Sequence, residues 1–376
     1  MKNVNLKRSQ WLGVAVGLSA ACMAAPAFAA DGKVYYDEGT VIETHDFNTK
    51  INFLISPNFT YTDYDNGGRR DVGVDSNGDT TSFDVNQVRV NFQGDLLGKQ
   101  FSYDIYHDLR SDGGGSELQD AWLQYNSDQV NLRWGQFYVP FSRQEIETDY
   151  GQQMLDRSFV ADRFAPGRQM GAMAHGPIAD GLTYAAGLFN GVEGQNHAGQ
   201  DNKLLYVAQV TGSTPNYGSR ATEGDLRKDN SSLDMTGGVA AYYTEGDVKA
   251  FDADVELFGL NADFGLKASG FSLQTEFYYE NADLKDSGTG SLDNFGFYVQ
   301  GGYLLDKNWE VATRFGYYEP DNDLADEDIE SYELVANYFI NGHALKLQTG
   351  VAWLVDNVGD NDTTDFQFET RLTGWL

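Results

Sequence analysis

The stretch from Phe47 to Tyr61 alternates apolar and polar side chains with a period of two residues. Phe47, Ile51, Phe53 and Ile55 share one parity, whereas the other parity is mostly polar. About 15 residues of alternation exceed an ordinary strand of about 5–6 residues. They suit a tilted strand that needs about 9–11 residues to cross a bilayer. Because lipid offers no partners for backbone hydrogen bonds, strands of this kind must close into a barrel.

The same alternation recurs along the chain. It is found in residues 88–93, 101–106, 130–135, 271–279, 295–300, 310–315 and 345–351. In a barrel the apolar parity faces lipid and the polar parity faces water in the lumen. In a soluble β-sandwich, the alternative, the apolar parity faces a core.

The links between these segments favour the barrel, because short and long links mostly take turns. The short links are predicted at residues 95–100, 127–129, 178–181, 263–267, 306–308 and 341–342. The long polar links are predicted at residues 64–81, 110–116, 139–168, 190–202, 245–253, 282–291, 319–329 and 356–363. Short periplasmic turns and long outer loops are typical of outer-membrane barrels with an even number of strands. We therefore predict an all-β fold, a transmembrane antiparallel β-barrel of about sixteen strands with both termini in the periplasm. One link, residues 213–232, is long where a short turn is expected.

The N-terminus has the three parts of a secretory signal peptide. Lys2, Lys7 and Arg8 precede an apolar run over residues 11–25, and Ala27 and Ala29 occupy the positions that a signal peptidase reads. We expect cleavage after Ala29, a short periplasmic segment over residues 30–45 and a barrel over residues 46–376. An uncleaved anchor helix is the alternative.

Cys22, the only cysteine, lies inside the predicted signal. Lipidation at Cys22 is a further alternative, although Ser19 stands where a lipobox has a large aliphatic residue.

The C-terminus indicates a last amphipathic strand. Phe366, Phe368 and Leu372 lie on one parity, and the chain ends on the apolar Leu376. The barrel-assembly machinery of the outer membrane recognises such a strand, although a terminal Phe is more typical. We therefore expect the Gram-negative outer membrane as the location, with lipid, lipopolysaccharide and the assembly machinery as partners.

The charge excludes several classes of function. Without Lys2, Lys7 and Arg8, the 26 basic residues become 23 against 56 acidic ones, so the net charge becomes −33. No basic stripe supports nucleic-acid binding, and this acidity does not favour binding to anionic lipid by charge alone. The acidic segments 75–79, 321–330 and 356–365 are interpreted as solvated hairpin tips, or alternatively as sites where divalent cations bridge to lipopolysaccharide.

No enzyme motif is visible, and the chain is not expected to be an enzyme. G-x-S-x-G, H-E-x-x-H and P-loop patterns are absent, and the five histidines have no metal-ligand spacing. We expect neither a cofactor nor a metal. A barrel hydrolase whose Ser and His meet only in space remains an alternative.

The longest predicted link, residues 139–168, is a candidate constriction loop. A loop of this length is usually functional or disordered. If it folds into the lumen, its basic and acidic side chains can face one another and set ion preference. The candidate residues are Arg143, Arg157, Arg163 and Arg168, opposed by Glu145, Glu147 and Asp149. The alternative is an outward surface loop with solvated charges.

This region resembles the phosphate-selective porin family. The resemblance is carried by Trp134-Gly135-Gln136-Phe137-Tyr138-Val139-Pro140-Phe141-Ser142-Arg143, Asp156-Arg157-Ser158, Phe164-Ala165-Pro166-Gly167-Arg168-Gln169-Met170-Gly171, His175-Gly176 and Gly187-Leu188-Phe189-Asn190-Gly191. It implies a sixteen-stranded barrel, a homotrimer, and a narrow zone that binds anions through basic residues. The positions carried over as pore-lining or loop-fixing are Arg133, Arg143, Arg157, Arg163 and Arg168.

The residues themselves predict a pore without strong ion preference. From Arg133 to Arg168 there are five arginines and five acidic residues, whereas a phosphate-binding pore needs an excess of positive charge. We expect a porin for passive diffusion of small hydrophilic solutes or ions, including phosphate or other anions, with at most weak anion preference or with cation preference. The alternatives are an adhesin or receptor that acts through its acidic loops, and the barrel hydrolase.

Overall fold

The fold comes from a computed structural model. It describes residues 32–64, 79–110, 117–191, 195–196, 203–227, 232–248, 253–285, 290–320, 328–357 and 363–376. The predicted signal peptide and the acidic stretches 75–78, 321–327 and 358–362 lie outside these residues.

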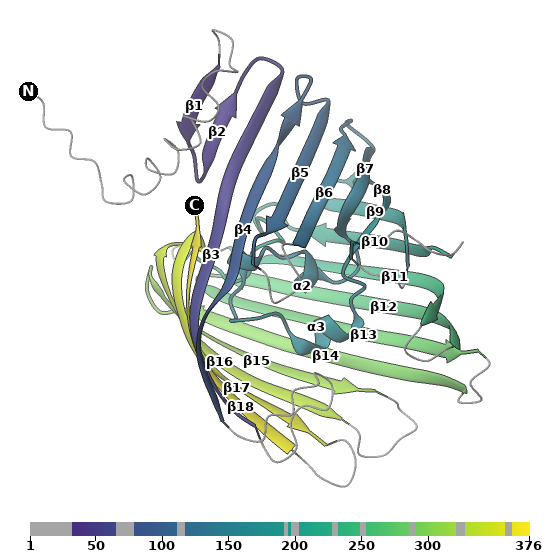
Figure 1. Cartoon of the computed structure of the whole chain (residues 1–376), viewed down its shortest axis with the longest axis vertical. Coiled ribbons are helices and arrows are strands. Elements are labelled where there is room, and N and C mark those ends of the chain that lie inside the picture. The colour runs from purple at the N-terminus through teal and green to yellow at the C-terminus, as the bar shows by residue number, and fades with distance from the viewer. Residues whose placement is uncertain are drawn as a thin grey trace, which may run out of the picture.

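Sixteen antiparallel strands, β3 to β18, form one closed barrel (Figure 1). Their bounds are β3 Phe47–Asp63, β4 Thr80–Leu96, β5 Phe101–Asp108, β6 Glu117–Tyr125, β7 Asn131–Tyr138, β8 Arg168–Ala179, β9 Leu182–Phe189, β10 Leu205–Ser213, β11 Asp234–Val248, β12 Ala253–Ala268, β13 Phe271–Leu284, β14 Gly290–Leu304, β15 Trp309–Glu319, β16 Ile329–Asn341, β17 Leu345–Asp356 and β18 Thr363–Trp375. The barrel closes where β18 pairs with β3, from Phe366 opposite Asp63 to Trp375 opposite Leu54. The predicted fold class, strand number and terminal strand are confirmed.

A short N-terminal hairpin continues the sheet beyond the chain's C-terminus. β1 (Lys33–Tyr36) pairs with β2 (Thr40–Glu43), and β2 pairs with β3 on the edge that β18 leaves free. The backbones of Leu376 and Phe53 exchange two hydrogen bonds of 2.9 Å at the point where β18 ends. The hairpin and the C-terminus therefore lie at the same end of the barrel (Figure 1).

The parity predicted from the sequence is the parity of the barrel wall. On β14, Val299 is exposed on the outside, whereas its neighbours Tyr298 and Gln300 are buried in the interior. On β18, Leu372 is exposed and Arg371 is buried. Apolar side chains thus cover the outer wall, and polar and charged side chains point inward, as expected of a barrel whose outside meets lipid.

The turns at the end that carries the termini are short, except for the link between β10 and β11, and one predicted link is misplaced. Residues 263–267 were predicted as a link, which is wrong, because they lie inside β12 and the turn is formed by Ser269 and Gly270. Both turn residues have positive φ, 52° and 83°, which a two-residue type I′ hairpin requires. The link between β10 and β11 is long, as the sequence indicated, and is described below.

Among the described residues, no helix is long and apolar enough to cross a membrane.

Candidate channel and constriction loop

The chain between β7 and β8, residues 139–167, turns into the barrel and is called the constriction loop here. It carries α2 (Arg143–Ile146), η1 (Asp149–Gly151) and α3 (Phe159–Phe164), and α2 and α3 lie inside the ring of strands (Figure 1). The Ser142 side chain caps α2 by accepting a hydrogen bond from the Glu145 backbone N–H, and Ser158 caps α3 through the Val160 N–H. Such caps satisfy N–H groups that a short helix cannot bond internally.

The apolar side of the constriction loop packs against the inner wall formed by β11 to β15. The Phe141 ring lies 4.8 Å from the Tyr242 ring, and the Phe164 ring stacks on Tyr278 at 5.3 Å. Gly296 on β14 makes room for α3, because a Cβ there would lie 2.8 Å from both Phe164 and Val160. The wall is therefore shaped to receive this loop.

Glu276, buried on β13, is the main polar anchor of the loop. Its carboxylate accepts hydrogen bonds from the backbone N–H groups of Arg143 at 2.9 Å and Gln144 at 2.8 Å. It also accepts hydrogen bonds from the Ser142 hydroxyl at 3.2 Å and the Tyr298 hydroxyl at 2.8 Å. A carboxylate at the start of α2 is the arrangement that free N–H groups favour.

The charges of the loop are mostly paired with near neighbours. Arg143 is fully buried, and its Nε lies 3.1 Å from Glu147, the residue that caps the C-terminal end of the same helix. The Arg157 guanidinium lies 2.9 Å from Asp149, which also pairs with Arg89 on β4. The expectation that these arginines face the acidic residues across an opening therefore differs from the structure. A short helix places residues four apart side by side.

The remaining candidates have separate surroundings. Arg168 begins β8, ion-pairs with Asp120 on β6 at 3.0 Å and donates to the Tyr138 hydroxyl at 2.7 Å. Glu145 is buried and accepts a hydrogen bond from the Gly167 N–H at 3.1 Å. Arg163 is exposed, and its guanidinium lies 5.8 Å from the centre of the Tyr318 ring.

Burial and charge shift the pKa values of the loop carboxyls in opposite directions. Burial raises the pKa of Glu145 to about 7, against the nearby guanidinium of Arg157. Burial also acts to raise the pKa of Asp149, but Arg89, Arg157 and Arg168 outweigh it and hold this pKa well below its usual range. Asp149 therefore stays ionised and holds the guanidinium groups of Arg89 and Arg157 together.

The long link between β10 and β11 also enters the lumen, from the end of the barrel opposite the constriction loop's entry. Its described part, residues 214–227, is called the luminal link here. The Ala221 carbonyl accepts a hydrogen bond of 2.9 Å from the Thr148 N–H, and the Glu223 N–H donates one of 2.9 Å to the Gly151 carbonyl. The sequence showed only that this link is too long for a turn.

Glu223 joins the luminal link to the constriction loop. Its buried carboxylate accepts hydrogen bonds from the Gln153 N–H at 2.6 Å, the Gln144 amide at 3.0 Å and the Gln300 amide at 2.8 Å. Burial and the neighbouring Glu223 raise the pKa of Glu147 well above its ordinary value, although Arg143 opposes the shift. The Glu147 and Glu223 carboxyls therefore interact, and this interaction and burial favour the neutral form of Glu147.

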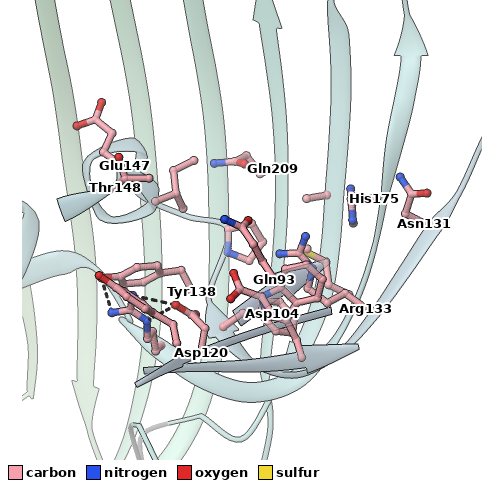
Figure 2. Close-up of a pocket in the computed structure, with 18 of the residues that line it drawn as sticks. Gln93, Asp104, Asp120, Asn131, Arg133, Tyr138, Glu147, Thr148, His175 and Gln209 are labelled. Atoms are coloured by element: carbon pink, nitrogen blue, oxygen red, sulfur yellow. Dashed lines mark hydrogen bonds and ion pairs between the residues drawn. The ribbon is translucent and has the colours of Figure 1, made fainter. Parts of the chain in front are cut away.

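A cavity of about 670 Å³ remains on the other side of the lumen, along β4 to β10 (Figure 2). Its acidic, basic and histidine lining residues are Asp104, Asp120, Arg133, Glu147, Asp149, Arg168 and His175. Four of the predicted site residues therefore border this cavity, and Arg143, Glu145, Arg157 and Arg163 do not.

Arg133 and Asp104 differ from the other charges of the cavity. Arg133 stacks over the Trp122 ring at 3.9 Å and donates to Gln124 at 2.9 Å. Within the described part of the chain, no carboxylate forms an ion pair with Arg133, and Asp104 accepts a hydrogen bond only from Asn91. The two charges interact electrostatically and point into the same space (Figure 2). Asp104, Trp122 and His175 were not among the predicted site residues. For Asp104, the polar parity of residues 101–106 already indicated a side chain that faces the lumen.

A closed barrel of sixteen strands with an apolar outer wall and a loop that narrows a polar lumen defines the class of outer-membrane porins. Residues 60–365 match the family described as phosphate-selective porin O and P, and the chain belongs to that family. Its location is the outer membrane, and the predicted resemblance is confirmed.

Solved structures share the fold at low sequence identity. The anion-selective porin from Comamonas acidovorans is 12% identical with a TM-score of 0.61, covering 87% of this chain and 100% of that one. The outer membrane channel DcaP of Acinetobacter baumannii is 14% identical with a TM-score of 0.60, covering 89% and 99%. The trimer form of OmpT from Vibrio cholerae is 12% identical with a TM-score of 0.58, covering 86% and 99%. Among curated proteins, no sequence matches the chain.

Proposed function

We propose that this porin is a passive diffusion channel for small hydrophilic solutes and ions, and that the passage runs along β4 to β10. The observation that carries the proposal is the cavity of about 670 Å³, bordered by both charged and aromatic side chains, which the constriction loop leaves open on that side. Sixteen-stranded barrels are wide enough for an aqueous channel. The proposal includes no enzymatic activity.

We propose further that the channel has only weak ion preference and is not specific for phosphate. Arg168 is neutralised by Asp120, and Asp149 by Arg89 and Arg157. The charges left without an ion pair in the cavity, Arg133 and Asp104, have opposite signs and nearly cancel. A phosphate site needs several convergent donors with an excess of positive charge.

The proposal extends to maturation and assembly. Residues 1–29 are removed after export, residues 30–45 stay in the periplasm, and the barrel-assembly machinery inserts residues 46–376. The mature protein is a homotrimer in contact with lipid and lipopolysaccharide, which is supported by the trimer form of a protein with the same fold.

Planar bilayer recordings test the channel. Purified, heat-modifiable trimer should give stepwise conductance increments, with a reversal potential near zero in a tenfold KCl gradient. The absence of channels from folded protein contradicts the diffusion function, and block by submillimolar phosphate contradicts the ion preference.

A further inference from the structure

The luminal link lies in the part of the lumen that the cavity does not reach. The residues that line the cavity come from β4 to β10, the constriction loop and Trp375, and none comes from the luminal link or from β11 to β17. The two inward-folded segments occupy the interior along β11 to β14, and a separate, smaller cavity of about 290 Å³ lies between the constriction loop and β15 to β18. The passage therefore lies to one side of the lumen, and its width depends on the luminal link and the constriction loop on the opposite side.

The luminal link is fastened to the wall by side chains along its whole described length. Arg220 ion-pairs with Asp263 on β12 at 2.7 Å. Lys267 on β12 donates to the Thr222 carbonyl at 3.0 Å, and the Asp225 carboxylate accepts a hydrogen bond of 3.1 Å from the Gly270 N–H. A surface turn has no need of buried ion pairs, so these contacts indicate a segment built to stay inside the barrel.

The luminal link also supports the constriction loop. The Tyr217 hydroxyl accepts a hydrogen bond of 2.7 Å from Arg143, and this side chain is buried between the two segments. The Ala221 and Glu223 backbones pair with the loop near η1, at Thr148 and Gly151. Removing the luminal link would leave Arg143 without this contact and two loop backbone groups without partners, which loosens the loop.

We propose that the luminal link fixes the solute size limit of the channel, by occupying the lumen along β11 to β14 and holding the constriction loop in place there. This role rests on the proposed diffusion function. Without the luminal link, solutes have a second route beside the constriction loop.

The first experiment replaces residues 215–234 with a two-residue Asn-Gly turn between Thr214 and Met235, whose backbones are hydrogen-bonded. Because Ser213 pairs with Thr236, a tight turn can join β10 to β11 without changing their register. The shortened variant should show a conductance at least roughly twofold above that of the unmodified protein, since the lumen of a sixteen-stranded barrel is wide once unfilled. It should also admit larger neutral polymers. An unchanged conductance and polymer limit in a folded variant overturns the proposal.

A second measurement tests, independently of conductance, whether the luminal link covers the inner wall of the barrel. Cys22 is the only cysteine and lies in the predicted signal, so Gln274→Cys introduces a single thiol on the inner wall. Gln274 is buried and meets Glu223 at 3.3 Å. A charged, water-soluble methanethiosulfonate should react with this thiol at least tenfold faster in the shortened variant. Equal, slow labelling in both backgrounds contradicts the filling role.

If the shortened variant does not fold, the full-length pair Tyr217→Ala with Arg220→Ala decides the question. It removes two anchors and should raise labelling of Gln274→Cys, whereas Asn216→Ala, at an exposed position of the same segment, should not. Equal labelling in the folded anchor variant and in the Asn216→Ala control overturns the proposal. If the unmodified protein forms no channels, the diffusion function fails, and the labelling comparison still tests the filling role separately.

Discussion

Neutralising Arg133 should shift the channel toward cations. In water, the Coulomb interaction energy between a monovalent ion and a charge on the wall about 7 Å away is about 0.6 kcal/mol. Screening at 0.1 M salt reduces this energy to about 0.3 kcal/mol. The effect has opposite signs for K⁺ and Cl⁻, so Arg133→Gln should change their permeability ratio about threefold. In a tenfold KCl gradient this corresponds to a reversal-potential shift of about 20 mV toward cation preference.

The partner charge supplies the matched test. Asp104→Asn should shift the reversal potential by a similar amount toward anions, and the double variant should return close to the unmodified protein. Lys307→Gln makes the same charge change as Arg133→Gln at an exposed turn between β14 and β15 and should leave the potential unchanged. The reversal potentials of all four variants are measured in planar bilayer recordings of folded trimers. A shift below about 3 mV for Arg133→Gln, far under the Coulomb expectation, would refute the placement of Arg133 in the passage.

Further predictions concern the anchors of the constriction loop. Glu276→Ala leaves the two N–H groups at the start of α2 without a partner, which costs about 1–3 kcal/mol of stability per buried group. The variant should therefore have a lower unfolding temperature in heat-modifiability gels and a higher current noise in bilayer recordings. Gly296→Val should displace α3 and raise noise in the same recordings, whereas Gly301→Ala, where a Cβ has its nearest neighbour at 3.6 Å, should not. Because burial and Glu223 raise the pKa of Glu147 above its ordinary 4.5, the stability that Glu147 contributes is complete below that pH and is lost as pH rises through the raised value. Thermal stability should therefore fall as the pH rises above about 5, less steeply in Glu147→Gln, and equal slopes in the two proteins would contradict the raised pKa of Glu147.

The sequence by itself determined the barrel. Alternation over two residues is a local property, and it correctly assigned Val299 and Leu372 to the outside of the wall. Loop length identified residues 139–168 as a candidate constriction and identified the link over 213–232 as anomalous. The misplaced turn at 263–267 shows the limit of this reasoning, because a polar residue such as Asp263 can mark an inward-facing strand position as readily as a turn.

Only the tertiary structure decided which charges meet. Arg143 pairs within its own helix, and Asp149 gathers guanidinium groups from β4 and from the loop. Arg133 and Asp104 meet without an ion pair because β5, β6 and β7 bring their inward faces together. These outcomes depend on strand register and on the closure of the barrel, which join residues far apart in the chain. The insertion of the luminal link depends on the same closure, because its partners on β12 and in the constriction loop come together only inside the finished barrel.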